Sequence, residues 1–262
     1  MAAIDDDLPV PLPIGDTLDL HSFRPGDVGS LVPEWLTVCR EAGITEVRII
    51  HGKGSGTLRA GVHALLERSP LVRGLRSDGN WGGVAVSLWD VATDEARVRA
   101  IVRASPRLLA LLEVVEAVGP RGAWVGAGAL RNRVWHTLHR LPGEPADGDV
   151  DVAWHGAGDP AEEARLASLL GAALAAPWDV GDQARYGATS AERGMATWPE
   201  TATCVAVRLA GGELELFAAH GWADLVGMVV RPIPGLPVEV WRARLAEKRW
   251  RQRFPWARIE PA

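Results

Sequence analysis

Three side chains near the N-terminus have the types and spacing that phosphate chemistry requires. Asp19 and His21 are two residues apart in a short alternating segment, so on a strand both would project from one face. His51 directly follows the β-branched run 47–50. A histidine beside a bound phosphate can exchange a proton at neutral pH, and a neighbouring carboxylate can orient its ring. Asp19, His21 and His51 are therefore candidate catalytic residues.

A glycine-rich segment follows His51 and could bind an anion. Gly52, Gly54 and Gly56 can turn backbone N–H groups toward a phosphodiester, and the start of the next helix adds partial positive charge. Lys53 and Arg59 would add full charges. The spacing differs from that of a Walker loop, and a purely structural turn is equally compatible with the glycines alone.

The elements expected around these residues form a βαβα-ββ unit. Two parallel strands of such a unit end at the same edge of the sheet, where ligands of open α/β sheets bind. This places His21 and His51 together. Hydrophobic periodicity and turn residues predict strands at 17–21, 47–50, 71–76 and 84–88, with helices at 28–42 and from 58 onward.

These motifs together resemble the Smr (small MutS-related) domain over residues 16–89. Leu18-Asp19-Leu20-His21 matches the first family motif, and His51-Gly52-Lys53-Gly54-Ser55-Gly56 matches the second, with Arg59 at the following basic position. Ser22 stands where members usually have glycine. The resemblance implies a fold similar to the C-terminal domain of bacterial initiation factor three. It also implies nucleic-acid binding and, in several members, nicking endonuclease activity.

A second candidate site begins at Asp149 and Asp151. On the strand expected at 149–154 both carboxylates would project from one face, about 6–7 Å apart. Carboxylates are the hard oxygen ligands that bind Mg²⁺ or Mn²⁺ beside a nucleotide's phosphates. Gly126 and Gly128 lie upstream, before Arg131 at an expected helix start that could receive phosphates. Taken alone, an Asp-x-Asp pair is more often a solvated strand edge.

The elements expected in the second half combine helices with strands in a mixed sheet. Thr93 and Ser105 are typical N-caps, and Pro106 suits a first helical position. Gly211-Gly212 is typical of a hairpin turn. The pattern predicts a helix over 162–175, hairpin strands at 201–209 and 213–217, and a last basic helix over 238–252.

Residues 95–260 resemble a bacterial nucleotidyltransferase-like family, a divergent branch of the polymerase-β-type nucleotidyltransferases. The stretches that carry this resemblance are 123–141, 149–154, 178–185, 198–201 and 229–232. It implies a metal–nucleotide site with Asp149 and Asp151 as metal ligands. Gly126, Gly128, Arg131 and Asn132 would lie near phosphate or at fold-critical positions.

This resemblance also implies a third carboxylate on a later strand, for which Asp182, Glu213 and Glu215 compete. Two stretches depart from the family pattern. Gly126-Ala127-Gly128 replaces a Gly-Gly or Gly-Ser pair, and Asp182-Gln183-Ala184-Arg185 stands where Asn-Gln-Ala-Arg is expected.

Composition limits the remaining classes of protein. Hydrophobic residues at 47% and charged residues at 23% exclude a disordered or fibrous chain. No apolar run reaches the ~18 residues of a membrane span, and Cys39 and Cys204 suit buried free thiols, so we expect a cytoplasmic protein with no membrane partner. Residues 241–262 hold seven basic and two acidic side chains in a chain of net charge −5. Trp250 and Trp256, interleaved with these arginines, are compatible with nucleic-acid contacts or with a solvated basic helix.

The sequence therefore predicts an α/β (α+β) protein of two domains, at 16–89 and 93–262, after a flexible arm at 1–15. The first would bind or nick DNA or RNA. The second would use Mg²⁺ or Mn²⁺ to transfer a nucleotidyl group from a nucleoside triphosphate to an unknown acceptor. Two alternatives stay open: a non-catalytic nucleic-acid-binding protein, or an active Smr nuclease joined to a degenerate nucleotidyltransferase scaffold.

Overall fold

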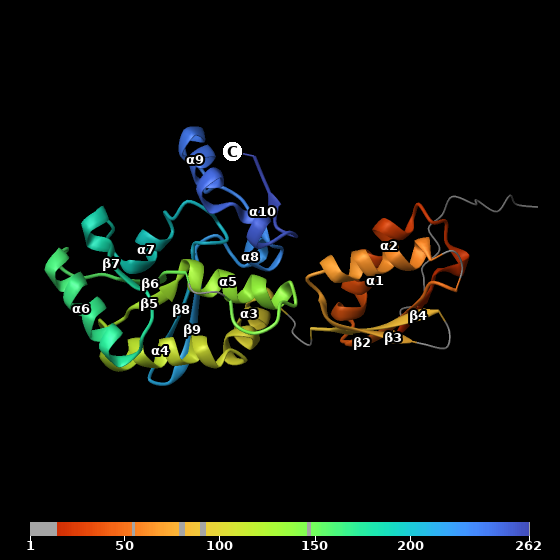
Figure 1. Ribbon diagram of the computed structural model, residues 1–262, viewed down its shortest axis with the longest axis horizontal. Helices are drawn as coiled ribbons and strands as arrows, with labels where there is room; N and C mark the ends of the chain where they lie inside the picture. The colour runs from red at the N-terminus through yellow and green to blue at the C-terminus, as the bar shows by residue number, and fades with distance from the viewer. Residues whose placement is uncertain (1–14, 54–55, 79–81, 90–92, 146–147, 262) are drawn as a thin grey trace, which may run out of the picture. The chain divides into compact units, whose positions relative to one another are not determined.

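The computed structural model describes residues 15–53, 56–78, 82–89, 93–145 and 148–261. The predicted arm, apart from Gly15, lies outside the described residues, as do Gly54 and Ser55. The chain divides into two compact units, Met1–Ala92 and Thr93–Ala262 (Figure 1).

The first unit is a four-stranded sheet covered by two helices. Its sheet order is β1-β2-β4-β3, with β1 parallel to β2 and the other pairs antiparallel. Helices α1 and α2 contact each other on one face of this sheet (Figure 1). The elements in chain order are β1 (Thr17–Asp19), η1 (Leu20–Ser22), α1 (Val28–Glu41), β2 (Glu46–Ile50), α2 (Thr57–Arg68), β3 (Val72–Asp78) and β4 (Gly83–Leu88).

One apolar core fixes the first unit. Leu36 of α1, Ile49 of β2 and Leu66 of α2 are fully buried together, each from a position that repeats at the helical or strand period. Burying such a side chain stabilises the fold by about 1.5–3 kcal/mol. The predicted strand at 17–21 is shorter than expected: it ends at Asp19, because residues Leu20–Ser22 turn as a 3₁₀ helix.

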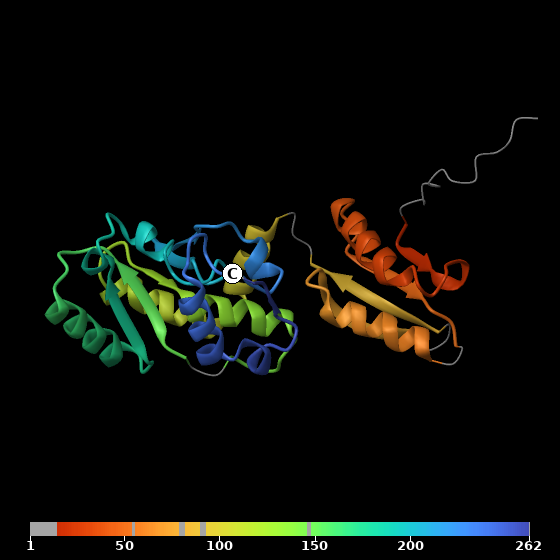
Figure 2. The same ribbon diagram turned by 90° about the horizontal axis from the view of Figure 1, so that it is seen from above.

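The second unit is built on a five-stranded mixed sheet of order β7-β6-β5-β8-β9. Strands β6 and β7 are parallel, whereas the other neighbours are antiparallel. Figure 2 shows the same sheet from above. Its core elements are α3 (Asp94–Arg103), α4 (Pro106–Val118), β5 (Trp124–Gly126), α5 (Ala127–Leu138), β6 (Val150–Trp154), α6 (Pro160–Ala173), β7 (Trp178–Asp182), η2 (Gln183–Tyr186), α7 (Ala191–Met195), β8 (Val205–Ala210) and β9 (Glu213–Ala218).

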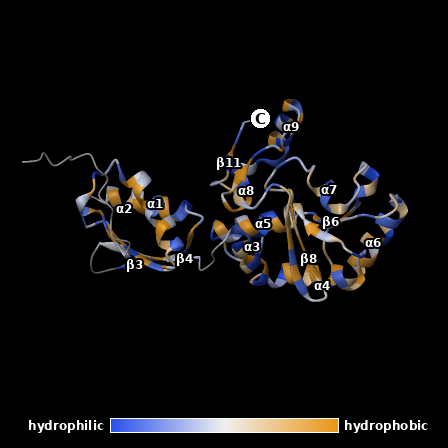
Figure 3. Cartoon of the chain, turned by 180° about the vertical axis from the view of Figure 1, so that it is seen from behind, coloured by the Kyte–Doolittle hydropathy of each residue, from blue (hydrophilic) through white to orange (hydrophobic). Residues whose placement is uncertain are grey.

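Alternation along β6 separates the core from the site. Val150 and Val152 are buried on one face, whereas Asp151 between them is half-buried on the other. Helix α4 packs against β8 and α6 against β7, and Figure 3 shows hydrophobic colour along β8 and α4. Ala153 on the face of Asp151 packs with α7 and Trp198. The sheet thus carries polar chemistry on the face opposite to Val150 and Val152.

The C-terminal segment differs from the single helix expected over 238–252. It breaks at Arg249, which has a left-handed backbone at φ 48 and separates two helices. The break lets Trp250 and Phe254 turn into the core, where both pack edge-on against Trp135. The elements of this segment are α8 (Ala223–Val226), β10 (Val229–Val230), α9 (Val238–Lys248), α10 (Trp250–Arg253) and β11 (Arg258–Ile259).

Other boundaries also differ from expectation. Asp149 precedes β6 rather than lying in it, and helix α5 begins at Ala127, which places Arg131 in its second turn instead of at its start. Residues 201–204 form turns before β8.

Within the described ranges, the chain has no helix of the length and apolarity that crossing a membrane requires.

Candidate functional site

Asp19 and His21 form a close pair at the end of β1. The Nδ1 atom of His21 lies 2.5 Å from an Asp19 oxygen, and the His21 backbone N–H donates to the same oxygen at 3.0 Å. These two hydrogen bonds, the backbone one first, hold the pKa of Asp19 below its ordinary value despite some burial. Both side chains are more than half exposed. The carboxylate thus orients an accessible imidazole.

Gly52 brings the two motifs of the first unit together. A Cβ atom on Gly52 would lie only 2.8 Å from Nε2 of His21, and its φ of +76 favours glycine. The His21 ring therefore sits against the backbone of the glycine-rich segment. This is the juxtaposition expected from the parallel pairing of β1 with β2.

His51 occupies a different environment from His21. It is only 7% exposed, and its Nδ1 lies 2.9 Å from the carbonyl oxygen of Gly52, so Nδ1–H donates to that oxygen. Its buried Nε2 has no hydrogen-bond partner among the described residues. The ring of His63 lies 5.8 Å away, and burial followed by the charges of His51 and Arg59 lowers the pKa of His63.

The cationic side chains of this loop are solvent-accessible. Lys53 and Arg59 are exposed, and Gly56 caps α2 with a left-handed φ of 83. Gly54, a predicted phosphate ligand, lies outside the described residues. Exposed cations beside a helix N-terminus suit a phosphate group.

In the second unit, pairing across three strands aligns two carboxylates. Asp151 of β6 is in parallel register with Asp179 of β7, and on its other side it faces Gly126 of β5. Residues in register share a face of the sheet, so both carboxylates project from the same side. The indole of Trp198 covers Gly126, where a Cβ would lie 3.0 Å from the ring. A pocket of about 270 Å³ opens here, lined by Asp151, Asp179, Gln183, Tyr186 and Trp198 among others.

Asp151 has a strongly perturbed carboxyl group. Burial first, and then the negative charge of Asp179, raise the pKa of Asp151 to about 6. The backbone N–H of Gly128 donates to it and acts in the opposite direction, as does the charge of Arg131. Two neighbouring carboxylates on one face of a sheet bind a cation more readily than either does alone.

Asp179 is the residue that sequence reasoning missed. It lies in the Trp178-Asp179-Val180 stretch, and only the pairing of β6 with β7 shows that it opposes Asp151. Alternation from buried Val180 was a signal that Asp179 would face the other way.

The three expected candidates for a third carboxylate lie elsewhere. Glu213 and Glu215 are on β9, three strands from β6, which is about 14 Å and too far to share an ion with Asp151. Glu215 pairs instead with Arg208. Asp182 is fully buried and accepts N–H groups of Gly156, Gly158 and Ala184.

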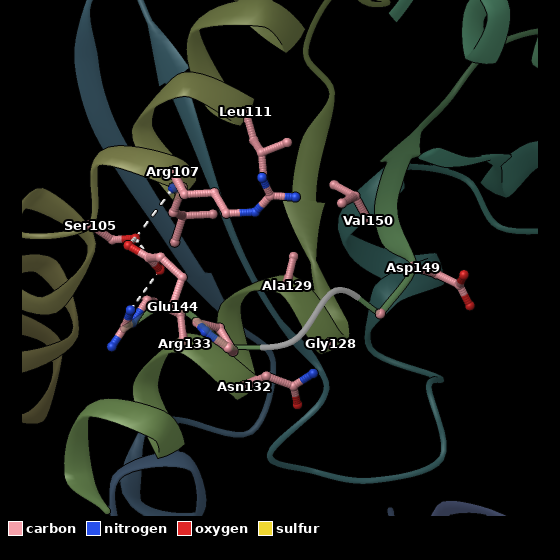
Figure 4. A pocket seen from close by; sticks show the side chains of 13 residues that line it. Ser105, Arg107, Leu111, Gly128, Ala129, Asn132, Arg133, Glu144, Asp149 and Val150 are labelled. Atoms are coloured by element: carbon pink, nitrogen blue, oxygen red, sulfur yellow. Dashed lines mark hydrogen bonds and ion pairs between the residues drawn. The ribbon is translucent and has the colours of Figure 1, made fainter. Parts of the chain in front are cut away.

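Asp149 lies at a second, smaller pocket. This pocket of about 40 Å³ is lined by Gly128, Asn132 and Arg133 of α5 and by Arg107 of α4. In Figure 4 the carboxylate of Asp149 points away from Arg107 and Arg133. The described residues contain no ready-made group of three ligating side chains. Asp151 and Asp179 are the two carboxylates that line the larger pocket together.

The turn that links β5 to α5 is strained. Ala127 has a φ of +46, a left-handed conformation that favours glycine, at the position where the family pattern has the second residue of its pair. Gly128 follows, and its N–H is turned toward Asp151. Strain held at a strand-to-helix turn is typical of functional sites.

Arg131 and Asn132 act as a unit behind this turn. Arg131 donates hydrogen bonds to the Thr203 hydroxyl, at 2.7 Å, and to the Asn132 side-chain oxygen, at 2.9 Å. Its guanidinium lies over the Trp250 ring, 4.3 Å from the ring centroid. Burial lowers the pKa of Arg131 to about 10, so it stays charged at neutral pH. Because the Asn132 oxygen faces Arg131, its amide N–H₂ faces Gly128. Arg131 is 4% exposed and is not among the residues that line either pocket, whereas Asn132 lines the smaller one.

A mixed sheet with paired aspartates beside a glycine-containing strand-to-helix turn defines a nucleotidyltransferase-type domain. The family model described as nucleotidyltransferase matches residues 113–259, more than half of the chain, and the chain belongs to this family. The model of the Smr domain matches residues 18–88, so the first unit is an Smr domain.

Relatives agree with both assignments. Over 68 residues the chain is 44% identical to Endonuclease MutS2 of Halalkalibacterium halodurans, and over 79 residues it is 35% identical to that of Halothermothrix orenii. These matches cover 26% and 30% of this chain, and the chain spans about a tenth of either relative's length. A solved NMR structure that reveals a CCA-adding enzyme head domain matches with a TM-score of 0.59 and 23% identity, over 65% of this chain and 98% of that one. The fold of the second unit is thus a head-domain fold.

Proposed function

We propose that the second unit transfers a nucleotidyl group from a nucleoside triphosphate to a hydroxyl acceptor. The observation that carries this proposal is the parallel register of Asp151 with Asp179 beside the turn that starts α5. In the balanced reaction, an acceptor oxygen forms a bond to the α-phosphorus. The bond from that phosphorus to the bridging oxygen breaks, and pyrophosphate leaves.

The nucleotide's phosphates would lie at the start of α5. The backbone N–H groups of its first turn would donate to an anion bound there, and the Asn132 amide would add a donor beside Gly128. Arg131 fixes the orientation of that amide from behind. These residues bind and orient the phosphates.

Asp151 and Asp179 would hold a divalent cation, and Asp149 could join them once a nucleotide is bound. Mg²⁺ fits this donor set, because it is usually held by one or two carboxylates plus substrate phosphates and waters. When bound, it supplies charge neutralisation at the α-phosphate. The exposed Asp179 carboxylate borders the pocket and is placed to accept the acceptor's proton.

For the Smr domain, we propose binding and nicking of a phosphodiester. The matched relatives are named endonucleases, and His21 is the exposed, carboxylate-oriented imidazole that can carry a proton. Lys53, Arg59 and the glycine-rich segment, which includes Gly54, would hold the phosphate. His51 would act from its buried position as a support for the Gly52 carbonyl.

A label-transfer assay tests the first proposal. The full chain is incubated with Mg²⁺, a hydroxyl acceptor and a nucleoside triphosphate labelled at the α-phosphate. The label should appear on the acceptor, and unlabelled pyrophosphate should be released. A label at the γ-phosphate should leave with pyrophosphate instead. Failure to bind any of the four nucleoside triphosphates would favour the degenerate-scaffold alternative.

A Gly52→Ala variant tests the second proposal. The added methyl would meet His21 Nε2 at 2.8 Å and must displace the ring. We expect nicking of supercoiled plasmid to fall by at least tenfold, as for His21→Ala. A matched Gly61→Ala variant, with open space around its position on α2, should nick normally. Equal activity of Gly52→Ala and wild type would contradict the role of His21.

A further inference from the structure

Five exposed arginines gather in the C-terminal segment of the second unit. They are unpaired with any acidic side chain of the described chain. The segment's other two cations, Arg244 and Lys248, are bound to Glu200 and Glu247. We call the five the arginine surface: Arg242, Arg249, Arg251, Arg253 and Arg258.

The fold exposes these arginines by burying the aromatic residues between them. Trp241, Trp250 and Phe254 are at most 4% exposed, so neighbouring positions face solvent. The left-handed backbone of Arg249 makes this possible, because it reorients α10 relative to the end of α9. A left-handed backbone is unfavourable for a residue other than glycine, and the burial of Trp250 offsets this cost.

The charge of this surface opposes that of the rest of the molecule. Residues 241–262 carry seven basic and two acidic side chains, a balance of +5, in a chain of net charge −5. The remainder therefore carries −10. Unpaired like charges repel each other, so their concentration in one short segment indicates an anionic partner.

The arginine surface belongs to the same part of the unit as the nucleotidyltransferase site. Trp250 of α10, which lies between Arg249 and Arg251, packs 4.3 Å from the guanidinium of Arg131. The charge of Arg131 in turn acts on Asp151. Helix α9 also contacts the turn beside the pocket. Arg244 of this helix donates a hydrogen bond of 2.6 Å to the carboxylate of Glu200, which follows Trp198 by two residues. A long anion bound along α9 and α10 can therefore reach the pocket.

We propose that the arginine surface binds the sugar–phosphate backbone of a single nucleic-acid strand, which makes the end of that strand the acceptor. The acceptor part rests on the proposed nucleotidyl transfer, whereas the binding part does not. Six of the seven cations are arginines, whose planar guanidinium matches phosphate geometry. Of the apolar side chains on α9 and α10, only Val238 and Val240 are exposed large ones, which is a small area for insertion into a membrane. The rings of Trp241, Trp250 and Phe254 are buried, and the half-buried ring of Trp256 already stacks on His139, so these rings are not free for base stacking. Recognition is therefore through phosphates and independent of sequence.

Fluorescence anisotropy with single-stranded RNA and DNA oligonucleotides of about 20 nucleotides tests the binding part. Every protein in this experiment is the full chain with Lys53→Ala and Arg59→Ala, so that the Smr domain contributes little to oligonucleotide binding. In this background, Arg249→Ala/Arg251→Ala/Arg253→Ala should raise Kd at least about tenfold and lower the slope of log K against log salt by about 2. Both oligonucleotide types should bind, with little effect of base sequence.

A matched control removes three exposed arginines from elsewhere in the second unit. Arg103→Ala/Arg121→Ala/Arg193→Ala changes the net charge equally, and we expect less than about a twofold change in Kd. The corresponding lysine variant of the three surface arginines should retain part of the affinity. Equal losses in the two alanine triples, or no loss in either, would overturn the proposal.

The acceptor part has its own outcome. The triple variant should bind nucleoside triphosphate as wild type does but label an oligonucleotide end at least about tenfold more slowly at low strand concentration. Transfer of label to small hydroxyl compounds but never to a strand would overturn this part while leaving nucleotidyl transfer intact. Absence of nucleotide binding in wild type would instead contradict nucleotidyl transfer and leave strand binding standing.

Discussion

At the scale of single residues, the stability of the fold depends on whether Asp151 is protonated. In the metal-free protein its pKa of about 6 lies above the unfolded value of ~3.9. The folded state therefore holds the proton more tightly, and the stability that Asp151 contributes is present below pH ~4 and is lost as pH rises through about 6. An ionised Asp151 opposes folding at neutral pH.

Asp151→Asn should consequently be more stable than wild type at pH 7.5 without metal, by roughly 1–3 kcal/mol, because it removes a half-buried charge. Asparagine keeps an oxygen for the Gly128 N–H. Denaturant unfolding at pH 7.5 and pH 4 measures this, and the difference should shrink at the lower pH. A variant less stable than wild type at both pH values would contradict it.

Ala127 offers a second test at the same scale. Because its φ is +46, Ala127→Gly should raise the free energy of unfolding by about 0.5–1 kcal/mol. Ala129→Gly, within the same helix, should lower it by a similar amount. Thermal unfolding of both variants decides, and destabilisation by both would show that Ala127 is not strained.

Residue types predicted part of the site. Spacing and resemblance predicted Gly128, Asn132, Asp149 and Asp151 as site residues. The first three line the smaller pocket, and Asp151 lines the larger one. Asp179 was missed because the register of β6 with β7 decides that it lies beside Asp151. The spacing of residues along the chain does not show this register. Arg131 was expected at a helix start, but the helix begins four residues earlier, at Ala127.

At the scale of elements, Asp182 holds β7, η2 and the loop after β6 together. Burial alone would raise the pKa of Asp182, but the N–H donors of Gly156, Ala184 and Gly158 outweigh it and hold this pKa below its ordinary value. A carboxylate with a lowered pKa stabilises the fold above the unfolded value of ~3.9, and that stability is lost as pH falls.

Asp182→Ala should therefore cost about 2–4 kcal/mol, since it leaves three N–H groups without an acceptor. Chemical denaturation at pH 7 measures the loss. Asp179→Ala, on the same strand but exposed, is the matched control and should change stability by less than ~0.5 kcal/mol. Comparable losses in the two variants would contradict the structural role of Asp182.

Periodicity predicted most elements because each buries a regular apolar face. Helices over 28–42 and 162–175 lie within two residues of α1 and α6. The helix expected over 238–252 was wrong at Arg249, since its interruption comes from the packing of Trp250 and Phe254 against Trp135, and local propensity does not show that packing.

At the scale of the whole molecule, the two candidate sites fall in separate compact units. Each unit has its own buried core, and the first buries residues such as Leu36 and Ile49 within itself. Both units were predictable, because each motif set lies within one continuous stretch of sequence.

Removal of residues 1–92 should therefore abolish nicking and preserve nucleotide binding within about twofold. Plasmid nicking and calorimetry on the truncated and full chains measure the two outcomes. Loss of nucleotide binding in a truncated chain that is folded by circular dichroism would contradict the independence of the units.

The proposed metal-dependent nucleotide site rests on Asp151 and Asp179. Titration calorimetry of each of the four nucleoside triphosphates, with and without Mg²⁺, tests it most directly. We predict Mg²⁺-dependent binding by wild type and by the control Glu213→Gln, with at least a tenfold loss in Asp151→Asn and in Asp179→Asn. Binding that is unchanged in both aspartate variants, or absent from wild type with every nucleotide, would contradict the account.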